Sequence, residues 1–174
     1  MNLNHLTLKT QEAVQAAQQY AFEKGHPQIE NEHLFYGLLE VDDTVLPFIF
    51  NKLQVQLPLL KQMNESALKR FSKVEGGTQV LSQKASQTLM NAIALAKKQQ
   101  DEYVATEHLL QALFESNGTL SKMLSDQGIT KNKLQDAIQE LRKGEKVTSA
   151  SAEGNYNALE KYAKNLNALA KEGK

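Results

Sequence analysis

The chain has no cysteine, no tryptophan and only three prolines among its 174 residues. Without cysteine it has no disulfide framework, no thiol nucleophile and no cysteine-ligated zinc site. It also has no run of about 18 apolar residues and no secretory leader at its start, so no membrane partner and a cytoplasmic location are expected. Its 20 basic and 20 acidic residues balance. Because the basic residues do not cluster with aromatics, nucleic acid is not expected as a partner.

What the sequence does contain is an internal repeat. Residues 29–40 align without a gap on residues 104–115, a shift of 75 positions, and five of the twelve aligned pairs are identical. Chance would give roughly one identity over such a stretch. Further along, the shift becomes 74, which aligns Leu46 with Leu120. The chain is therefore predicted to be a tandem duplication of one small helical unit.

The predicted fold class is all-α, because apolar residues recur at helical spacing through both copies and no segment alternates β-branched residues as a strand would. Thr7 and Ser82 are expected to cap the first helix of each copy. One four-helix unit buries its apolar faces poorly alone, so the two units are expected to pack about a pseudo-twofold axis as an eight-helix domain. The predicted helices cover residues 7–24, 31–41, 46–53, 58–71, 82–99, 106–115, 119–127 and 130–142.

Composition divides the chain further. Residues 1–71 and 82–142 are predicted to be the two repeats, and residues 72–81 the loop between them. Residues 143–154 are mostly Gly, Ser, Thr, Ala and charged residues, which predicts a flexible linker. Residues 155–174 are predicted to form one extra helix that finds no partner in the chain. Its apolar stripe, which would be left exposed, consists of Leu159, Tyr162, Leu166 and Leu169.

No constellation of catalytic residues is apparent. The two Glu-His pairs invite a metal-site interpretation, but adjacent helical residues point about 100° apart, so Glu32 and His33 cannot chelate from one face. We instead expect Asn31 and Thr106 to cap their helices, with the following glutamate near the positive end of the helix dipole. No nucleophile motif and no phosphate-binding loop occur. The sequence therefore predicts a binding module without catalytic residues, metal site or cofactor.

The repeated motifs resemble a known family. Ile-Glu-Asn-Glu-His-Leu-Phe-Tyr-Gly-Leu-Leu from position 29 and Val-Ala-Thr-Glu-His-Leu-Leu-Gln-Ala-Leu from position 104 are similar to the Clp N-terminal domain of the Clp/Hsp100 AAA+ unfoldases. The Leu-Glu-Lys-Tyr stretch from position 159 resembles the ClpB-type disaggregases. The resemblance implies a substrate receptor for unfolded or aggregated polypeptides, within a cytoplasmic homohexamer that uses ATP and Mg and works with the DnaK system after heat stress. Residues 155–174 would begin its first ATPase domain.

The resemblance also implies which residues handle substrate. Thr7, Asp101 and Glu107 match polar positions associated with substrate in the ClpB type, although Thr7 would equally serve as a helix cap and Asp101 as a solvated loop acid. The ClpC type suggests an alternative, in which Glu32 and Glu107 bind phosphorylated arginine or an adaptor protein, since a carboxylate accepts a guanidinium fork. The apolar part of a shallow binding groove is expected from residues on the fifth and sixth helices: Leu89, Met90, Ile93 and Leu110.

Overall fold

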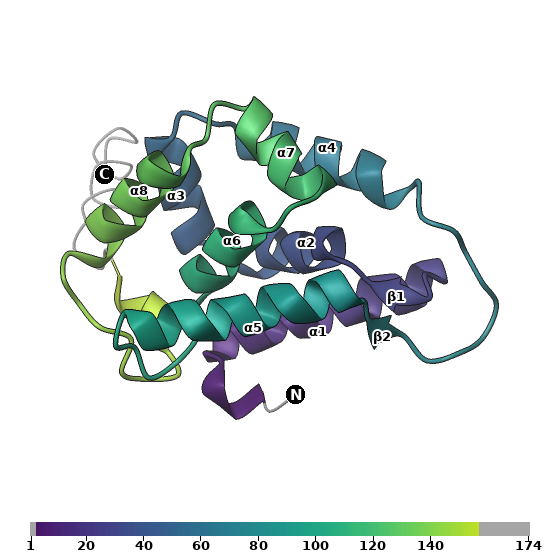
Figure 1. The fold of residues 1–174 in the computed structure, drawn as a ribbon, viewed down its shortest axis with the longest axis horizontal. Coiled ribbons are helices and arrows are strands. Elements are labelled where there is room, and N and C mark those ends of the chain that lie inside the picture. Colours follow the sequence, from purple (N-terminus) through teal and green to yellow (C-terminus); the bar gives the residue numbers. More distant parts are fainter. Residues whose placement is uncertain (1–2, 157–174) are drawn as a thin grey trace, which may run out of the picture.

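Eight α-helices make up most of the computed structural model, which describes residues 3–156 (Figure 1). The all-α class and the eight helices predicted from the sequence are confirmed; the predicted extra helix at residues 155–174 lies almost wholly outside the described residues. In chain order the elements are η1 (Leu3–His5), α1 (Leu8–Lys24), β1 (Gln28–Ile29), α2 (Asn31–Val41), α3 (Val45–Lys52), α4 (Leu57–Leu68), β2 (Val80–Leu81), α5 (Gln83–Lys98), α6 (Thr106–Glu115), α7 (Thr119–Asp126), α8 (Lys131–Arg142) and η2 (Ala152–Asn155).

The second helix of each repeat begins differently from the prediction. The N-cap positions of α2 and α6 are Glu30 and Ala105, one residue before the expected caps. A histidine three residues further on accepts the cap's backbone N–H through Nδ1, at 2.9 Å for His33 and 2.8 Å for His108. The imidazole thus satisfies a donor that the helix start leaves unpaired. The repeated Glu-His motif is a helix-capping device, and its histidine is the residue that caps.

A pair of backbone bridges relates the two halves. β1 and β2 pair in parallel, with Ile29 opposite Leu81, and an isolated parallel bridge joins Leu6 to Val104. The shift of 75 positions turns Leu6 into Leu81 and Ile29 into Val104, so each bridge is the symmetry copy of the other. In both, the N–H of the next residue donates to the partner's carbonyl oxygen at 3.0 Å. The pseudo-twofold relation therefore extends from the helices to individual hydrogen bonds.

The hydrophobic core lies around α2 and α6. Figure 1 shows these two helices in the middle of the molecule, with α1 and α5 on one side and α3, α4, α7 and α8 on the other. Leu34 and Leu38 of α2 and Leu109 and Leu113 of α6 are fully buried. Among the described residues, no helix is both long enough and apolar enough to cross a membrane.

The first half is packed more tightly than the second. A Cβ atom added to Gly37 of α2 would lie 2.0 Å from the carbonyl oxygen of Ala13 of α1, so glycine allows the two backbones to touch. The repeat places Ala112 and Thr88 at the equivalent positions of α6 and α5. These two side chains require a wider separation, so α1 and α2 approach more closely than α5 and α6.

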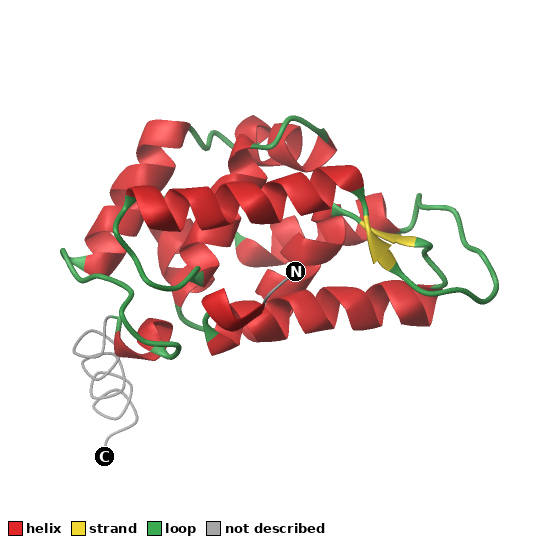
Figure 2. Cartoon of the chain, turned by 60° about the horizontal axis from the view of Figure 1, so that its bottom comes forward, coloured by secondary structure: helices red, strands yellow, loops and turns green. Residues whose placement is uncertain are grey.

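The segment after α8 differs from the prediction of a flexible linker over residues 143–154. It turns back over the domain, and Val147, Ala152 and Tyr156 are buried against it. The carbonyl of Ala150 accepts the N–H of Leu8 at 2.8 Å, beside the start of α1. Figure 2 shows this last described segment as a loop and a short helix beside the other helices. Composition suggested a solvated chain because few of its side chains are apolar. Its polar groups instead pair with donors and acceptors at the helix ends.

Candidate functional site

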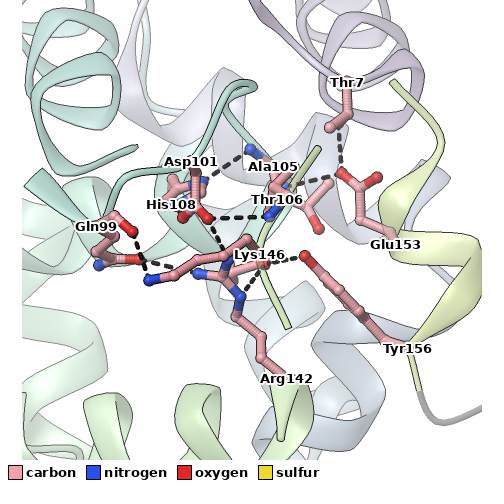
Figure 3. A network of polar contacts seen from close by, with 12 residues as sticks. Thr7, Gln99, Asp101, Ala105, Thr106, His108, Arg142, Lys146, Glu153 and Tyr156 are labelled. Atoms are coloured by element: carbon pink, nitrogen blue, oxygen red, sulfur yellow. Dashed lines mark hydrogen bonds and ion pairs between the residues drawn. The ribbon is translucent and has the colours of Figure 1, made fainter. Parts of the chain in front are cut away.

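The three polar residues for which the family resemblance implies substrate handling, Thr7, Asp101 and Glu107, are all buried in one cluster. Figure 3 labels Thr7 and Asp101 among its members. Thr7 precedes α1, Asp101 follows α5 and Glu107 lies in the first turn of α6. Thr7 and Glu107 are 0% exposed and Asp101 is 8% exposed. The resemblance implies that all three handle substrate, which would require them to be accessible. They are closed off because residues 147–156 bond to each of them, as the next paragraphs describe.

Glu153 places its carboxylate at the N-terminal end of α6. Its Oε1 atom accepts the hydroxyl of Thr7 and, at 3.2 Å, the backbone N–H of Thr106. That N–H belongs to the first turn of a helix, where backbone donors have no partner within the helix and the dipole favours a negative charge. The other carboxylate oxygen of Glu153, Oε2, is buried without a hydrogen-bond partner in the described chain.

Asp101 is the anion at the centre of the second group of contacts. His108 Nε2 lies 2.8 Å from Asp101 Oδ2, and Arg142 donates to Oδ1, which also accepts the N–H of Val147 at 2.9 Å. His108 accepts at Nδ1, so its proton is on Nε2 and is donated to Asp101. Burial alone would raise the pKa of Asp101, but the hydrogen bonds from His108 and Arg142 lower it well below its usual range. Asp101 is therefore an ionised anchor for three donors.

The buried carboxyl group of Glu107 has fewer polar partners than that of Asp101. Its Oε1 accepts the phenol of Tyr156 at 2.9 Å and lies 3.8 Å from Nε of Arg142, whereas its Oε2 has no partner in the described chain. Burial, and then the nearby carboxylate of Glu153, raise the pKa of Glu107 to about 8. Burial also raises the pKa of Glu153. The cluster thus holds two carboxyl groups that resist being charged together.

This arrangement predicts a pH-dependent stability. The pKa of Glu107 is higher in the folded chain than its ordinary value near 4.5. Protonated Glu107 therefore stabilises the fold fully below pH 4.5, and this contribution to the free energy of unfolding is lost as the pH rises through about 8. We expect Glu107→Gln to remove this loss and to be more stable than the wild type at pH 9, by on the order of 3 kcal/mol. Urea unfolding at pH 5 and pH 9 measures it. The exposed control Glu102→Gln should keep the wild-type pH profile. An unchanged profile for Glu107→Gln would contradict the assignment.

The symmetry-equivalent surface in the first half is open. Ser82, Asn31 and Glu32 stand there in place of Thr7, Thr106 and Glu107, and they line a pocket of about 520 Å³ together with Lys84. Asn31 Oδ1 is buried without a hydrogen-bond partner in residues 3–156. Where the second half has Asp101 and His108, the first has His26 and His33, 2.8 Å apart. The two halves share the same arrangement of helices, but this surface is filled only in the second half.

The apolar set divides between core and surface. Leu89 and Leu110 are each 1% exposed and belong to the core, so their prediction as binding residues is wrong for this conformation. Met90 is 60% exposed and Ile93 is half-buried on the neighbouring turn of α5. Helical periodicity predicted an apolar stripe, but not which of its residues are buried and which are exposed. Met90 and Ile93 therefore remain as surface candidates.

Four residues of the cluster were missed in the sequence: His108, Arg142, Glu153 and Tyr156. The repeat contains a signal for one of them, since His108 has a copy at the capping position of the other half. Arg142 lies in α8, Glu153 in the predicted linker and Tyr156 at the start of the predicted extra helix, where neither spacing nor charge marks them. Their partners are more than 40 positions away.

Comparisons with known proteins agree with the repeat and the fold. Residues 5–127 and 80–172 match the family model for the Clp repeat (R) N-terminal domain. Over its whole length the chain is 42% identical to the chaperone protein ClpB of Bacteroides thetaiotaomicron and 38% identical to that of Porphyromonas gingivalis. It covers 20% of each, so it spans about a fifth of the length of these relatives.

Solved structures share the fold at low identity. The Hsp104 N-terminal domain from Candida albicans has a TM-score of 0.78 at 18% identity, covering 86% of this chain and 99% of that one. A ClpV N-domain in complex with a VipB peptide has a TM-score of 0.66 at 16% identity, covering 79% of this chain and 86% of that one.

Proposed function

This chain belongs to the Clp repeat (R) N-terminal domain family, and from that premise we propose that it is the substrate-recognition domain of an ATP-dependent disaggregase. In this proposal it binds exposed apolar segments of unfolded or aggregated polypeptides. The ATP, the Mg, the hexamer and the cooperation with the DnaK system belong to the cytoplasmic parent protein. The observation that carries the proposal is the alignment of all 174 residues with ClpB chaperones that are about five times longer.

The surface of α5 supports a weak, adaptable mode of binding. Met90 and Ile93 are three residues apart and therefore lie on one face of the helix. Methionine has a flexible, polarisable side chain that adapts to partners of different shape. Covering roughly 120 Å² of apolar surface at about 25 cal/mol per Å² yields about 3 kcal/mol before the loss of chain entropy. Such binding becomes effective when several tethered copies act together.

A charge at Met90 tests this surface. We expect Met90→Glu to weaken binding of a permanently unfolded protein such as casein about tenfold, because burying the carboxylate in an apolar contact is unfavourable. Fluorescence anisotropy measures the affinity. The matched control is Gln15→Glu, which places the same charge at the exposed, symmetry-equivalent position of α1. Equal losses in the two variants would remove the assignment to α5.

A second candidate function concerns the open pocket in the first half. A carboxylate beside a lysine suits a ligand with both a guanidinium and a phosphate, such as phosphoarginine, and Glu32 and Lys84 line that pocket. Glu107, the other residue proposed for this role, is buried under Tyr156, so the support rests on Glu32. Titration with phosphoarginine separates the candidates, because the apolar side chains of Met90 and Ile93 offer no charged group to bind it.

A further inference from the structure

Residues 147–156 contact the cluster as a ligand would. Three different groups of the segment bond to the three predicted site residues: the Val147 N–H to Asp101, the Glu153 carboxylate to Thr7 and the Tyr156 phenol to Glu107. Figure 3 shows Glu153 pointing toward Thr7. Directly before the segment, Lys143 and Gly144 have φ angles of 51° and 85°. These left-handed conformations end α8 and reverse the chain, which directs the segment back to the cluster.

The first half shows that the repeat does not need such an occupant. Its equivalent surface, around Ser82, Asn31 and Glu32, is an open pocket, although both halves keep the same helices and the same capping histidines. Residues 72–81, which the shift of 75 positions aligns with residues 147–156, leave that pocket open. The segment 147–156 therefore fills a surface whose counterpart in the first half is available.

The occupied state is incompletely paired. Oε2 of Glu107, Oε2 of Glu153 and Nε of Arg142 are all buried without a hydrogen-bond partner in the described chain. Each such group opposes burial unless water reaches it, because it has lost its hydrogen bonds to solvent. The burial of two neighbouring carboxyl groups adds to this opposition. Specific hydrogen bonds thus hold the segment in place, yet its release would return several unpaired buried polar groups to water.

We propose that residues 147–156 are an intramolecular ligand of this cluster, and that the cluster is a receptor site for external polypeptide segments with a carboxylate side chain three residues before a tyrosine. The carboxylate of the bound segment accepts the Thr7 hydroxyl and the Thr106 N–H, and its phenol donates to Glu107. A backbone N–H further upstream in the segment donates to Asp101. This inference rests on the proposed role in polypeptide recognition. It adds a polar site, with its own chemistry, to the apolar surface of α5.

A tethered ligand competes strongly with an external one. A short tether gives an effective concentration on the order of millimolar. An external segment of the same intrinsic affinity therefore binds the wild-type chain weakly, since the free site is only a small fraction of the population. Weakening the internal contacts should expose the site without altering the residues that form it.

The test uses a fluorescein-labelled peptide with the sequence of residues 146–156. Glu153→Ala combined with Tyr156→Ala removes the two side-chain contacts of the internal segment, and this release variant should bind the peptide at least tenfold more tightly than the wild type. Adding Thr7→Val, which keeps the shape but removes the hydroxyl, should reverse most of that gain. A control peptide with alanine in place of its glutamate and tyrosine should bind neither chain. Equal affinity of the wild type and the release variant would overturn the proposal.

Far-UV circular dichroism shows whether the release variant is folded. If it is not, a second measurement on the wild-type chain tests the proposal. In the wild-type chain, excess unlabelled peptide should displace the internal segment and speed hydrogen exchange at the amide of Val147. Unchanged exchange at saturating peptide would also overturn the proposal. Casein binding to the wild type, measured in parallel, reports on the proposed function by itself. It distinguishes failure of that function from failure of the polar site.

Discussion

Asp101→Ala is expected to lower the free energy of unfolding by about 3–5 kcal/mol. The carboxylate of Asp101 is the shared acceptor for His108, Arg142 and the N–H of Val147. Its removal leaves a buried guanidinium without its anion, and breaking one partner of a buried pair is more destabilising than never having the pair. Chemical denaturation at pH 7, followed by circular dichroism, measures the change.

Two further variants identify the cause of that loss. Asp136→Ala removes an exposed aspartate of α8 and should change stability by no more than about 0.5 kcal/mol. Combining Asp101→Leu with Arg142→Leu removes both buried charges, so the double variant should be more stable than the sum of the single effects predicts. Strict additivity would show that Asp101 and Arg142 do not act as a pair.

Gly37→Ala should destabilise the domain by about 2–4 kcal/mol, although alanine is normally the better helix residue by about 1 kcal/mol. The added methyl group would lie 2.0 Å from the carbonyl oxygen of Ala13 and 2.8 Å from its carbonyl carbon. Both atoms belong to the backbone of α1, so no side chain can rotate to make room. The two helices must separate, which disturbs the buried faces that they share.

The second repeat supplies the matched control for this substitution. Ala112 occupies the equivalent position in α6, and Ala112→Gly is expected to lower stability by only about 1 kcal/mol, through the lower helix propensity of glycine. Thermal unfolding of both variants compares the two halves directly. A stabilised Gly37→Ala variant would mean that α1 and α2 tolerate a wider spacing.

The repeat made much of the fold predictable. Its shift of 75 positions, the periodic apolar residues and the caps at Thr7 and Ser82 are local or self-comparing signals, and they lead to eight helices in two related halves. The position of a residue across a stripe is different, because it depends on how neighbouring helices meet. Leu89 and Met90 are adjacent and both apolar, yet one is buried and the other exposed.

The cluster was only half predictable for a related reason. Thr7, Asp101 and Glu107 were selected together through a family resemblance, and the structure brings them together. Among the groups that complete the cluster, Glu153 lies in a segment whose composition is typical of solvated chain, and Tyr156 begins the predicted extra helix. Glu153 is 146 positions from Thr7. Local composition carries no information on a hydrogen bond of that range, which depends on the three-dimensional arrangement of the whole domain.

The two backbone bridges have a consequence for how such a chain arises and folds. Leu6 and Val104 are 98 positions apart, Ile29 and Leu81 are 52 apart, and each bridge joins one half to the other. Such long-range contacts form late and tie the halves into one cooperative folding unit. A polypeptide with a single copy would present both bridge edges unpaired. Two such polypeptides would pair these edges with each other about a true twofold axis. The duplicated chain is therefore equivalent to a homodimer whose two subunits are joined in one polypeptide.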